Sequence, residues 1–402
     1  MDAQSNLSVP AVAPGRPPPL LLGRAWLPEA DGPAVVTVRG EEVVDITSRQ
    51  APTVRDICEM PDPAAWVASA PGRAIGSLAT LLADSAIAPR SPNPVDATGR
   101  RDRPWLLAPI DLQAVKAAGV TFVVSLLERV IEEQAKGSPQ RAAAIRADIV
   151  ALIGDDLSQL VPGSPQAMQV KQALVAKGVW SQYLEVGIGP DPEIFTKAQP
   201  LSAVGPGADI GILPTSTWNN PEPEIVLVVS SSGRIAGATL GNDVNLRDVE
   251  GRSALLLGKA KDNNASCAIG PFIRLFDNGF GLEDVKRAEV RLAVQGTDGY
   301  RLEGASSMSQ ISRAPESLVA AAAGAHHQYP DGFVLFLGTM FAPVQDRHQA
   351  GQGFTHAVGD VVSIETPMLG RLVNRVLHSA DCPPWTFGAS HLMRNLSGRG
   401  LL

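Results

Sequence analysis

Short apolar runs separated by Gly, Pro and Asp recur along most of the chain. Between residues 20 and 56, "LLLGRAWL", "AVVTVRG" and "EEVVDIT" are apolar or alternating runs of the kind that is typical of strands. "SAPGRAIGSLATLLADSA" adds one short helix. The polar, Pro-rich segment 91–104 then predicts a boundary between a small N-terminal β/α domain, residues 1–104, and a second domain, residues 105–402.

A helical pattern is concentrated in one part of the second domain. The stretch 138–178 is rich in Ala and carries apolar residues at helical spacing, among them Ile145, Ile149 and Leu152. Two helices joined by "VPGSPQ" are expected there. We therefore predict a helical insertion at about residues 128–180.

Strand signals return after Trp180. "PEIVLVVSSSGRIAGATLGNDV" contains two apolar runs around a Ser-Ser-Gly turn, and "AEVRLAVQGTDGYRLEG" contains two runs around Gly-Thr-Asp-Gly. Both patterns predict hairpins. The 38 Gly and 33 Pro residues agree with many turns between strands. The predicted fold class is α+β and rich in β-structure.

The charge balance argues against two classes of partner. The 402 residues include 34 Lys+Arg and 41 Asp+Glu, a net charge of −7 without a basic cluster. Nucleic acids and anionic membranes are bound by clustered Lys and Arg. Three Cys residues cannot form a disulfide framework, and no stretch reaches the roughly 18 apolar residues of a membrane span. The Pro-rich leader Met1–Pro19 does not look like a signal peptide, so the expected location is the cytoplasm.

Two carboxylates stand one residue apart in "NNPEPEIVLVV". Alternation along a strand places Glu222 and Glu224 on the same face. Burying two like charges without partners is unfavourable, and a hard cation such as Mg²⁺ resolves that conflict by binding carboxylate oxygens. The alternative is a solvent-facing pair at a strand edge.

Three later residues add candidate chemistry. Asp243 ends the second run of the predicted hairpin, which returns it to the two glutamates as a third metal ligand. Lys261 follows among small polar residues, where a lysine near a metal can act as a base; the alternative is a surface lysine. Thr339 lies on a Gly turn after "FLG", where its hydroxyl and a backbone N–H can hold a carboxylate.

The order of these motifs resembles the fumarylacetoacetate hydrolase superfamily over about residues 105–402. The motifs are, in chain order, "DPEIFTKA" (191–198), Glu222-Pro223-Glu224, Asn242-Asp243-Val244, Lys261 through Gly270-Pro271, and Gly338-Thr339. The resemblance implies a mixed β-roll fold and substrates that bear a 2-oxo acid. It also implies a divalent metal, Mg²⁺ with Mn²⁺ as an alternative, bound by Glu222, Glu224 and Asp243.

One departure separates branches of this superfamily. Hydrolytic members carry a His that activates water, and Ser125 occupies that place here. A serine cannot act as a general base unaided. The chain therefore resembles more closely the dehydratase branch, which implies conversion of a 2-keto-3-deoxy-pentonate of the D-xylonate or D-arabinonate type to 2-oxoglutarate semialdehyde. The alternatives are hydrolysis or decarboxylation of a 2,4-diketo acid on the same metal site, or a non-enzymatic protein that retains the fold.

The resemblance also implies roles for individual residues. Glu193 and Lys261 are the expected catalytic pair: one removes the C3 proton from a metal-bound substrate and the other assists loss of the C4 hydroxyl. Ser125, the N–H of Leu126, Lys261 and Thr339 are expected to bind the substrate. The expected partners are a small 2-keto sugar acid and a second copy of the chain, in a homodimer or homotetramer, with no nucleic acid and no membrane.

Overall fold

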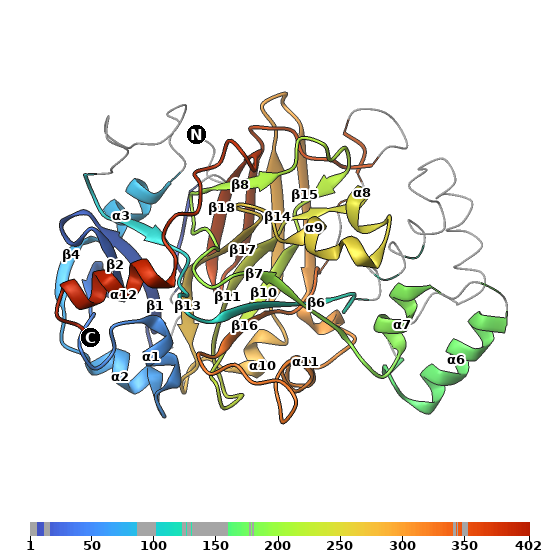
Figure 1. Cartoon of the computed structure of the whole chain (residues 1–402), viewed down its shortest axis with the longest axis horizontal. Helices are drawn as coiled ribbons and strands as arrows, with labels where there is room; N and C mark the ends of the chain where they lie inside the picture. Colours follow the sequence, from blue (N-terminus) through green and yellow to red (C-terminus); the bar gives the residue numbers. More distant parts are fainter. Residues whose placement is uncertain are drawn as a thin grey trace.

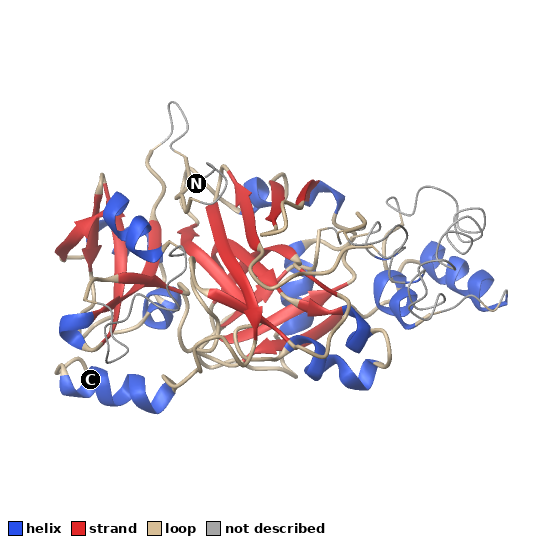
Figure 2. Cartoon of the chain, turned by 90° about the horizontal axis from the view of Figure 1, so that it is seen from above, coloured by secondary structure: helices blue, strands red, loops and turns tan. Residues whose placement is uncertain are grey.

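The computed structural model describes residues 6–11, 17–86, 102–122, 126, 130, 160–176, 178, 181–340, 343, 345–347 and 353–402. Strands form the centre of the molecule and most helices lie around its outside (Figure 2). The predicted α+β, strand-rich class is confirmed.

The described strands form two large sheets and one small pair (Figure 1). In spatial order, the first sheet contains β4 (Arg73–Ser77), β3 (Glu42–Asp45), β2 (Gly32–Arg39), β1 (Leu21–Leu27), β13 (Cys267–Leu275), β11 (Ile235–Asp243), β10 (Pro223–Val229), β16 (Phe333–Phe336), β6 (Ala114–Gly119) and β7 (Glu193–Ala198), with β5 (Trp105–Leu107) paired to β1. The second contains β15 (Arg301–Ser307), β14 (Glu289–Gln295), β17 (Val361–Thr366), β18 (Gly370–His378) and β8 (Asp209–Ile212). The pair is β12 (Asn245–Leu246) and β9 (Asn219–Asn220).

The helices of the described ranges are mostly short. They are α1 (Val54–Glu59), α2 (Pro63–Ser69), α3 (Leu78–Ser85), α6 (Pro165–Ala176), α7 (Gln182–Ile188), α8 (Arg247–Glu250), α9 (Leu257–Lys261), α10 (Leu282–Val285), α11 (Pro315–Ala322) and α12 (Ala389–Gly398), with 3₁₀ turns at Pro28–Ala30, Ala254–Leu256 and Met308–Gln310. Helix α6 lies within the predicted insertion; most other residues of that segment are outside the described residues.

Strand β10 is apolar from Ile225 to Val229 because both of its faces are covered. Leu227 packs in the core cluster shared with the second sheet, which includes Leu292. Val226 and Val228 pack in a different cluster that includes Ile57 of helix α1. A strand covered on both faces has a continuous apolar sequence instead of an alternating one, which explains the run "IVLVV".

Strands β10 and β11 form the predicted hairpin. Pro223 pairs with Asn242 and Glu224 pairs with Gly241 across the antiparallel register. The N–H of Asp243 donates a hydrogen bond to the carbonyl of Glu222 at 3.1 Å. The fold therefore returns the end of β11 to the start of β10, as the sequence pattern predicts. The second predicted hairpin is formed by β14 and β15.

Strands from both sides of residue 104 share the first sheet. Strand β1 pairs antiparallel with β13, and Leu21 lies opposite Arg274. At the other end of the chain, helix α12 lies against the N-terminal strands (Figure 1), where Asn395 Nδ2 donates to the carbonyls of Ala30 and Asp31 at 3.0 Å each. The expected boundary at 104 thus falls within one continuous sheet, and its status as a domain boundary stays a prediction.

Among the described helices, none combines the length and the apolar character needed to cross a membrane.

Candidate metal centre and active site

Three buried carboxylates, which we call the acid cluster, meet where β10 begins and β11 ends. Ligand oxygens of Glu222, Glu224 and Asp243 all lie within 4.8 Å of one another. Their residues are 2%, 1% and 1% exposed, respectively. The alternative of a solvent-facing glutamate pair therefore does not describe this strand.

The environment of Glu224 disfavours its charged form. Burial is the main cause that raises the pKa of Glu224 well above its usual value, and the neighbouring charges of Asp243 and Glu222 raise it further. Lys261 and the N–H of Gly338 act in the opposite direction but do not compensate. A bound cation would remove this cost, because it favours the ionised carboxylates.

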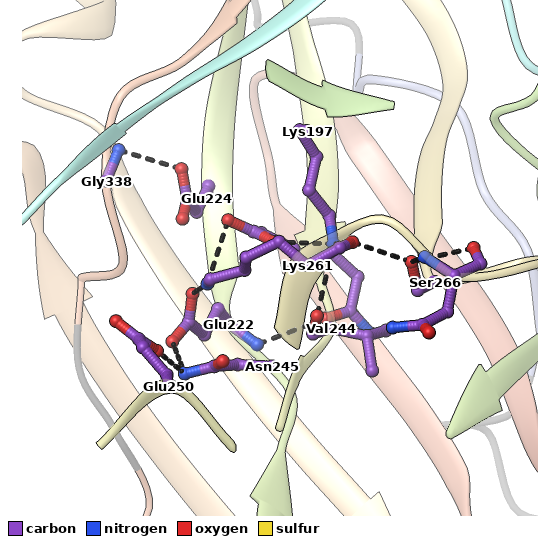
Figure 3. A network of polar contacts seen from close by, with 12 residues as sticks. Lys197, Glu222, Glu224, Val244, Asn245, Glu250, Lys261, Ser266 and Gly338 are labelled. Carbon is purple, nitrogen blue, oxygen red and sulfur yellow. Dashed lines mark hydrogen bonds and ion pairs between the residues drawn. The ribbon is translucent and has the colours of Figure 1, made fainter. Parts of the chain in front are cut away.

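The turn at Gly338 supplies one polar contact to this cluster. The N–H of Gly338 donates to Glu224 Oε2 at 2.7 Å (Figure 3). Gly338 has a φ of +99°, and a Cβ at this position would overlap the side chain of Thr121. Glycine therefore allows the backbone to aim this N–H at the carboxylate. Thr339, the next residue, lines the same cavity.

Lys261, the last residue of α9, reaches into the acid cluster. Its Nζ lies 2.5 Å from Glu222 Oε2 and 3.1 Å from Asp243 Oδ2 (Figure 3). The side chain is 4% exposed, and Nζ lies 5.6 Å from the centroid of the Phe195 ring. The alternative of a surface lysine does not describe this residue.

Lys197, which the sequence analysis did not single out, is the second cation of the cluster. It is fully buried, and its Nζ lies 2.8 Å from Asp243 Oδ1. It also donates to the carbonyl of Val244 at 3.1 Å and to the carbonyl of Lys261. Burial raises the pKa of Asp243, but the ammonium groups of Lys197 and Lys261 outweigh burial and hold that pKa below its usual value.

Strand β7 brings Glu193 to the same place. Glu193 pairs with Gly119 of β6, and its carboxylate lies so close to Gly119 that a Cβ there would overlap it. Glu193 and Phe195 line the cavity, and Lys197 continues on the same face of the strand. The alternation of Glu193, Phe195 and Lys197 is the sequence signal through which Lys197 could have been found.

Glu250 and Asn245 are two further residues that the sequence analysis missed. Asn245 Nδ2 donates to Glu222 Oε1 at 3.0 Å and to Glu250 Oε2 at 2.6 Å (Figure 3). Glu250 ends the four-residue helix α8 and is 7% exposed. Its place beside the acid cluster follows from tertiary packing, because no periodic pattern in the sequence indicates it.

Most of these side chains line one small cavity of about 20 Å³ that is partly open to solvent. Its described lining residues are Ala118, Gly119, Val120, Glu193, Phe195, Glu222, Glu224, Asp243, Glu250, Lys261 and Thr339. The three clustered acids carry more negative charge than Lys197 and Lys261 balance, and carboxylate oxygens are the ligands that Mg²⁺ prefers. The donor set therefore fits a hard divalent cation.

The described lining residues of this cavity do not include two of the expected substrate contacts. Ser125 lies outside the described residues. Leu126 is buried in a separate core cluster with residues of α6 and α7, and its N–H donates to the carbonyl of Phe122 at 2.9 Å. A contact between Leu126 and the substrate therefore stays a prediction.

The segment that carries the acid cluster matches a known family. Residues 181–377 match the model of the fumarylacetoacetate (FAA) hydrolase C-terminal domain. This range holds Glu193, Lys197, all three clustered acids and Lys261. This match confirms the resemblance to the fumarylacetoacetate hydrolase family that the motif order indicates.

Two curated relatives are similar to about half of the chain. A probable 2-keto-3-deoxyxylonate dehydratase of Haloferax volcanii is 32% identical over 194 residues, which are 48% of this chain and 63% of that protein. A 2-dehydro-3-deoxy-D-arabinonate dehydratase of Saccharolobus solfataricus is 30% identical over 192 residues, which are 46% of this chain and 58% of that protein. The matched regions thus span less than two thirds of either relative.

A solved structure extends the likeness to most of the chain. A 2-keto-3-deoxy-D-arabinonate dehydratase complexed with magnesium and 2,5-dioxopentanoate matches with a TM-score of 0.57 and 19% identity, over 89% of this chain and 99% of that one. At this identity the likeness shows a common fold. The predicted fold type is therefore confirmed beyond the family segment.

Proposed function

We propose that this protein is a Mg²⁺-dependent dehydratase that converts a 2-keto-3-deoxy-pentonate to 2-oxoglutarate semialdehyde, 2,5-dioxopentanoate. The observation that carries the proposal is that Glu193 and Lys261 line the same cavity as the acid cluster. The names of both curated relatives support the reaction class. The ligands in the solved structure of similar fold support the metal and the product.

Glu222, Glu224 and Asp243 would hold the cation. When bound, Mg²⁺ would polarise the 2-oxo acid and so make the C3 proton more acidic. Mn²⁺ has similar ligand preferences and is the expected substitute.

Two proton transfers remain for the protein. An ammonium group held by two carboxylates has a proton to donate, which favours Lys261 as the acid and Glu193 as the base. Glu193 then removes a proton from C3, and Lys261 gives a proton to the C4 hydroxyl, which leaves as water. Loss of water leaves a C3=C4 double bond conjugated with the 2-oxo group. Loss of a proton from C5 and gain of one at C3 then move the double bond to C4=C5, and tautomerisation of that enol gives the semialdehyde. Each enzyme group needs one compensating proton transfer to return to its starting state.

The direct test is a coupled assay. The protein is incubated with Mg²⁺ and with 2-keto-3-deoxy-D-xylonate or 2-keto-3-deoxy-D-arabinonate, and the semialdehyde is detected with an NAD(P)-dependent aldehyde dehydrogenase. We expect product formation that EDTA abolishes and that added Mg²⁺ restores. Formation of pyruvate from a 2,4-diketo acid, without semialdehyde from either pentonate, would contradict the proposal and favour the hydrolase alternative.

Two variants test the assigned residues. Glu193→Gln and Lys261→Met each remove one proton-transfer group while keeping a similar side-chain volume. We expect kcat to fall by about 10²-fold or more in each. Calorimetric titration with Mg²⁺ serves as the control for Glu193→Gln, because Glu193 is not a member of the acid cluster and metal affinity should change by less than about threefold. Near-normal turnover in either variant would remove that residue from the mechanism.

The expected homodimer or homotetramer stays a prediction, which sedimentation velocity of the purified protein tests.

A further inference from the structure

Helix α9 is too short to place its last residue, Lys261, by itself. The helix has five residues, and isolated helices of this length are not stable in water. Its buried residues are Ala260 and Lys261, so a single small apolar side chain packs this helix into the core. Contacts from other elements must therefore fix where the Lys261 ammonium lies.

Two side chains hold the backbone carbonyl of Lys261. Lys197 Nζ and Ser266 Oγ both donate to it, and the Ser266 bond is 2.8 Å long (Figure 3). The carbonyl of Asn263 shares the Ser266 proton at 2.9 Å, and the N–H of Asn263 donates to Ser266 Oγ at 2.9 Å. The Ser266 hydroxyl, on a residue that is 3% exposed, thereby closes the turn that follows α9.

Both of these residues are also tied to the end of the strand that carries Asp243. The N–H of Val244 donates to the carbonyl of Ser266 at 3.2 Å, and Lys197 Nζ donates to the carbonyl of Val244 at 3.1 Å. Lys197 Nζ lies 2.8 Å from Asp243 Oδ1 as well. The backbone of Lys261 is therefore held at a fixed place beside Asp243, and its side chain spans the gap to Asp243 Oδ2 at 3.1 Å.

A lysine side chain is a flexible four-carbon stem, and a proton donor must lie within hydrogen-bond reach of the group that leaves. Fixing the backbone from which the stem starts limits where the ammonium can go. We propose that Ser266, together with Lys197, is a positioning residue that keeps the Lys261 ammonium in the cavity by holding the carbonyl of Lys261. The value of this alignment for proton transfer rests on the proposed dehydratase function, whereas the placement itself does not.

The first test is the kinetics of Ser266→Ala with a 2-keto-3-deoxy-pentonate at saturating Mg²⁺. The variant removes one of the two donors to the Lys261 carbonyl and leaves the Lys261 side chain itself unchanged. We expect kcat to fall at least about fivefold, because the proton donor is less often aligned. We expect KM to change less than about twofold, because the metal ligands are untouched.

Ser85→Ala is the matched control. Ser85 is 1% exposed, and its hydroxyl also links two backbone groups: Oγ donates to the carbonyl of Leu81 at 2.6 Å and accepts from the N–H of Leu106 at 2.8 Å. It belongs to α3 and does not line the cavity. We expect a similar loss of stability in both variants, measured by urea denaturation, but an unchanged kcat in Ser85→Ala.

The second test measures the placement of Lys261 without turnover. The folded, metal-free protein is treated with an amine-reactive acetylating reagent, and the rate of modification of each lysine is followed by peptide mass spectrometry. The Lys261 side chain is 4% exposed, so it must leave its place to react. We expect it to react at least about fivefold faster in Ser266→Ala than in the wild type, because local opening is easier. Lys259, which is exposed on the same helix, is the internal reference and should react equally in both.

An unchanged kcat, or an unchanged rate of acetylation of Lys261, in Ser266→Ala would overturn the proposal. Equal changes in Ser85→Ala would also overturn it, because the effect would then come from a general loss of stability. Acetylation needs no turnover, so a wild-type protein that converts neither pentonate would contradict the proposed function, while the role of Ser266 in placing Lys261 would still be tested.

Discussion

The acid cluster of the site and the network around Arg347 are both buried, but they balance charge differently. Arg347 donates to both oxygens of Asp360, at 2.6 and 2.8 Å, and to Asp298 at 3.1 Å. His356 Nδ1 lies 3.0 Å from Asp360 as well. Asp298 is half exposed, so its charge is solvated and the buried pair is neutral. The charges of the Arg347 network are therefore balanced without a ligand.

Among the described residues, the acid cluster is not balanced in this way. Its three acids share two ammonium groups, and the pKa of Glu224 is raised, mainly by burial. In the Arg347 network burial also acts to raise the pKa of Asp360, but hydrogen bonds from His356 and Arg347 outweigh it and lower that pKa. A buried carboxylate thus stabilises the fold where cations match its charge, whereas buried carboxylates in excess of the neighbouring cations form a candidate cation site.

Removing one cation from each network gives the largest expected effects. Lys197→Met and Arg347→Met each leave a buried carboxylate without its main partner, and each should lower the free energy of unfolding by about 3–5 kcal/mol. Urea denaturation in EDTA measures both losses. A loss below about 1 kcal/mol in either variant would show that the lost ion pair is replaced by solvent.

Magnesium should raise the thermal stability of these two variants by different amounts. In Lys197→Met a bound cation takes over the charge of Asp243, so saturating Mg²⁺ should raise the midpoint of thermal unfolding more than it does in the wild type. In Arg347→Met the shift should equal that of the wild type, because the cation binds elsewhere. Equal shifts in all three proteins would contradict the inference that Lys197 balances the charge of the acid cluster.

Glu224→Gln should weaken Mg²⁺ binding without lowering the stability of the metal-free protein. The change removes one of the three proposed metal ligands, so we expect Mg²⁺ affinity to fall at least 100-fold, which corresponds to about 2.7 kcal/mol. It also removes like-charge repulsion and keeps an acceptor for the Gly338 N–H. The metal-free variant should therefore be at least as stable as the metal-free wild type. Calorimetry and urea denaturation in EDTA test the two halves separately, and a marked loss of metal-free stability would contradict the second.

A smaller effect is expected from the pH dependence of the Arg347 network. Burial lowers the pKa of His356 below its usual value of 6.5, and this outweighs the opposing effect of Asp360. The unfolded chain therefore binds the imidazole proton more readily. The contribution of neutral His356 to stability is present above about pH 6.5 and is lost as the pH falls toward the folded-state pKa.

His356→Gln tests this dependence. Between pH 7.5 and 5.5, urea denaturation should show the wild type losing on the order of 1 kcal/mol more than the variant. Asp360 and Arg347, the charged groups that face position 356, are present in both the wild type and the variant. The difference between the two curves of stability against pH therefore reports on His356 itself. Parallel curves would mean that His356 does not titrate differently in the two states.

The smallest effect is expected where an ion pair is exposed. Arg73 Nη2 lies 3.0 Å from Glu29 Oε1, and the two side chains are 64% and 56% exposed. Arg73→Ala should change the free energy of unfolding by less than about 0.5 kcal/mol and leave Mg²⁺ affinity unchanged. This variant sets the baseline against which the buried networks are judged.

The sequence predicts the acid cluster because local patterns determine its geometry. Alternation places Glu222 and Glu224 on one face, and a hairpin of two matched runs returns Asp243 to them. The partners of these acids are harder to predict. Lys197 and Glu250 come from β7 and α8, and their positions depend on the order of strands in the sheet and on the fold of a four-residue helix.

Other expectations depend on features outside local patterns. The β-rich class follows from many short runs, whereas the pairing of β1 with β13 across the predicted boundary joins residues far apart in the sequence. The roles of Ser125 and Leu126 rest on resemblance, and most of the helical insertion lies outside the described residues. The cytoplasmic location stays a prediction.

The placement of β6 limits how small a working fragment of this protein can be. The family segment begins at residue 181, yet β6, at Ala114–Gly119, lies between β16 and β7 in the sheet. A polypeptide cut to residues 181–377 would expose the edges of β16 and β13 and detach β7, the strand that carries both Glu193 and Lys197. Such a truncation would retain Glu222, Glu224 and Asp243 but lose the backbone that aligns Glu193 with them.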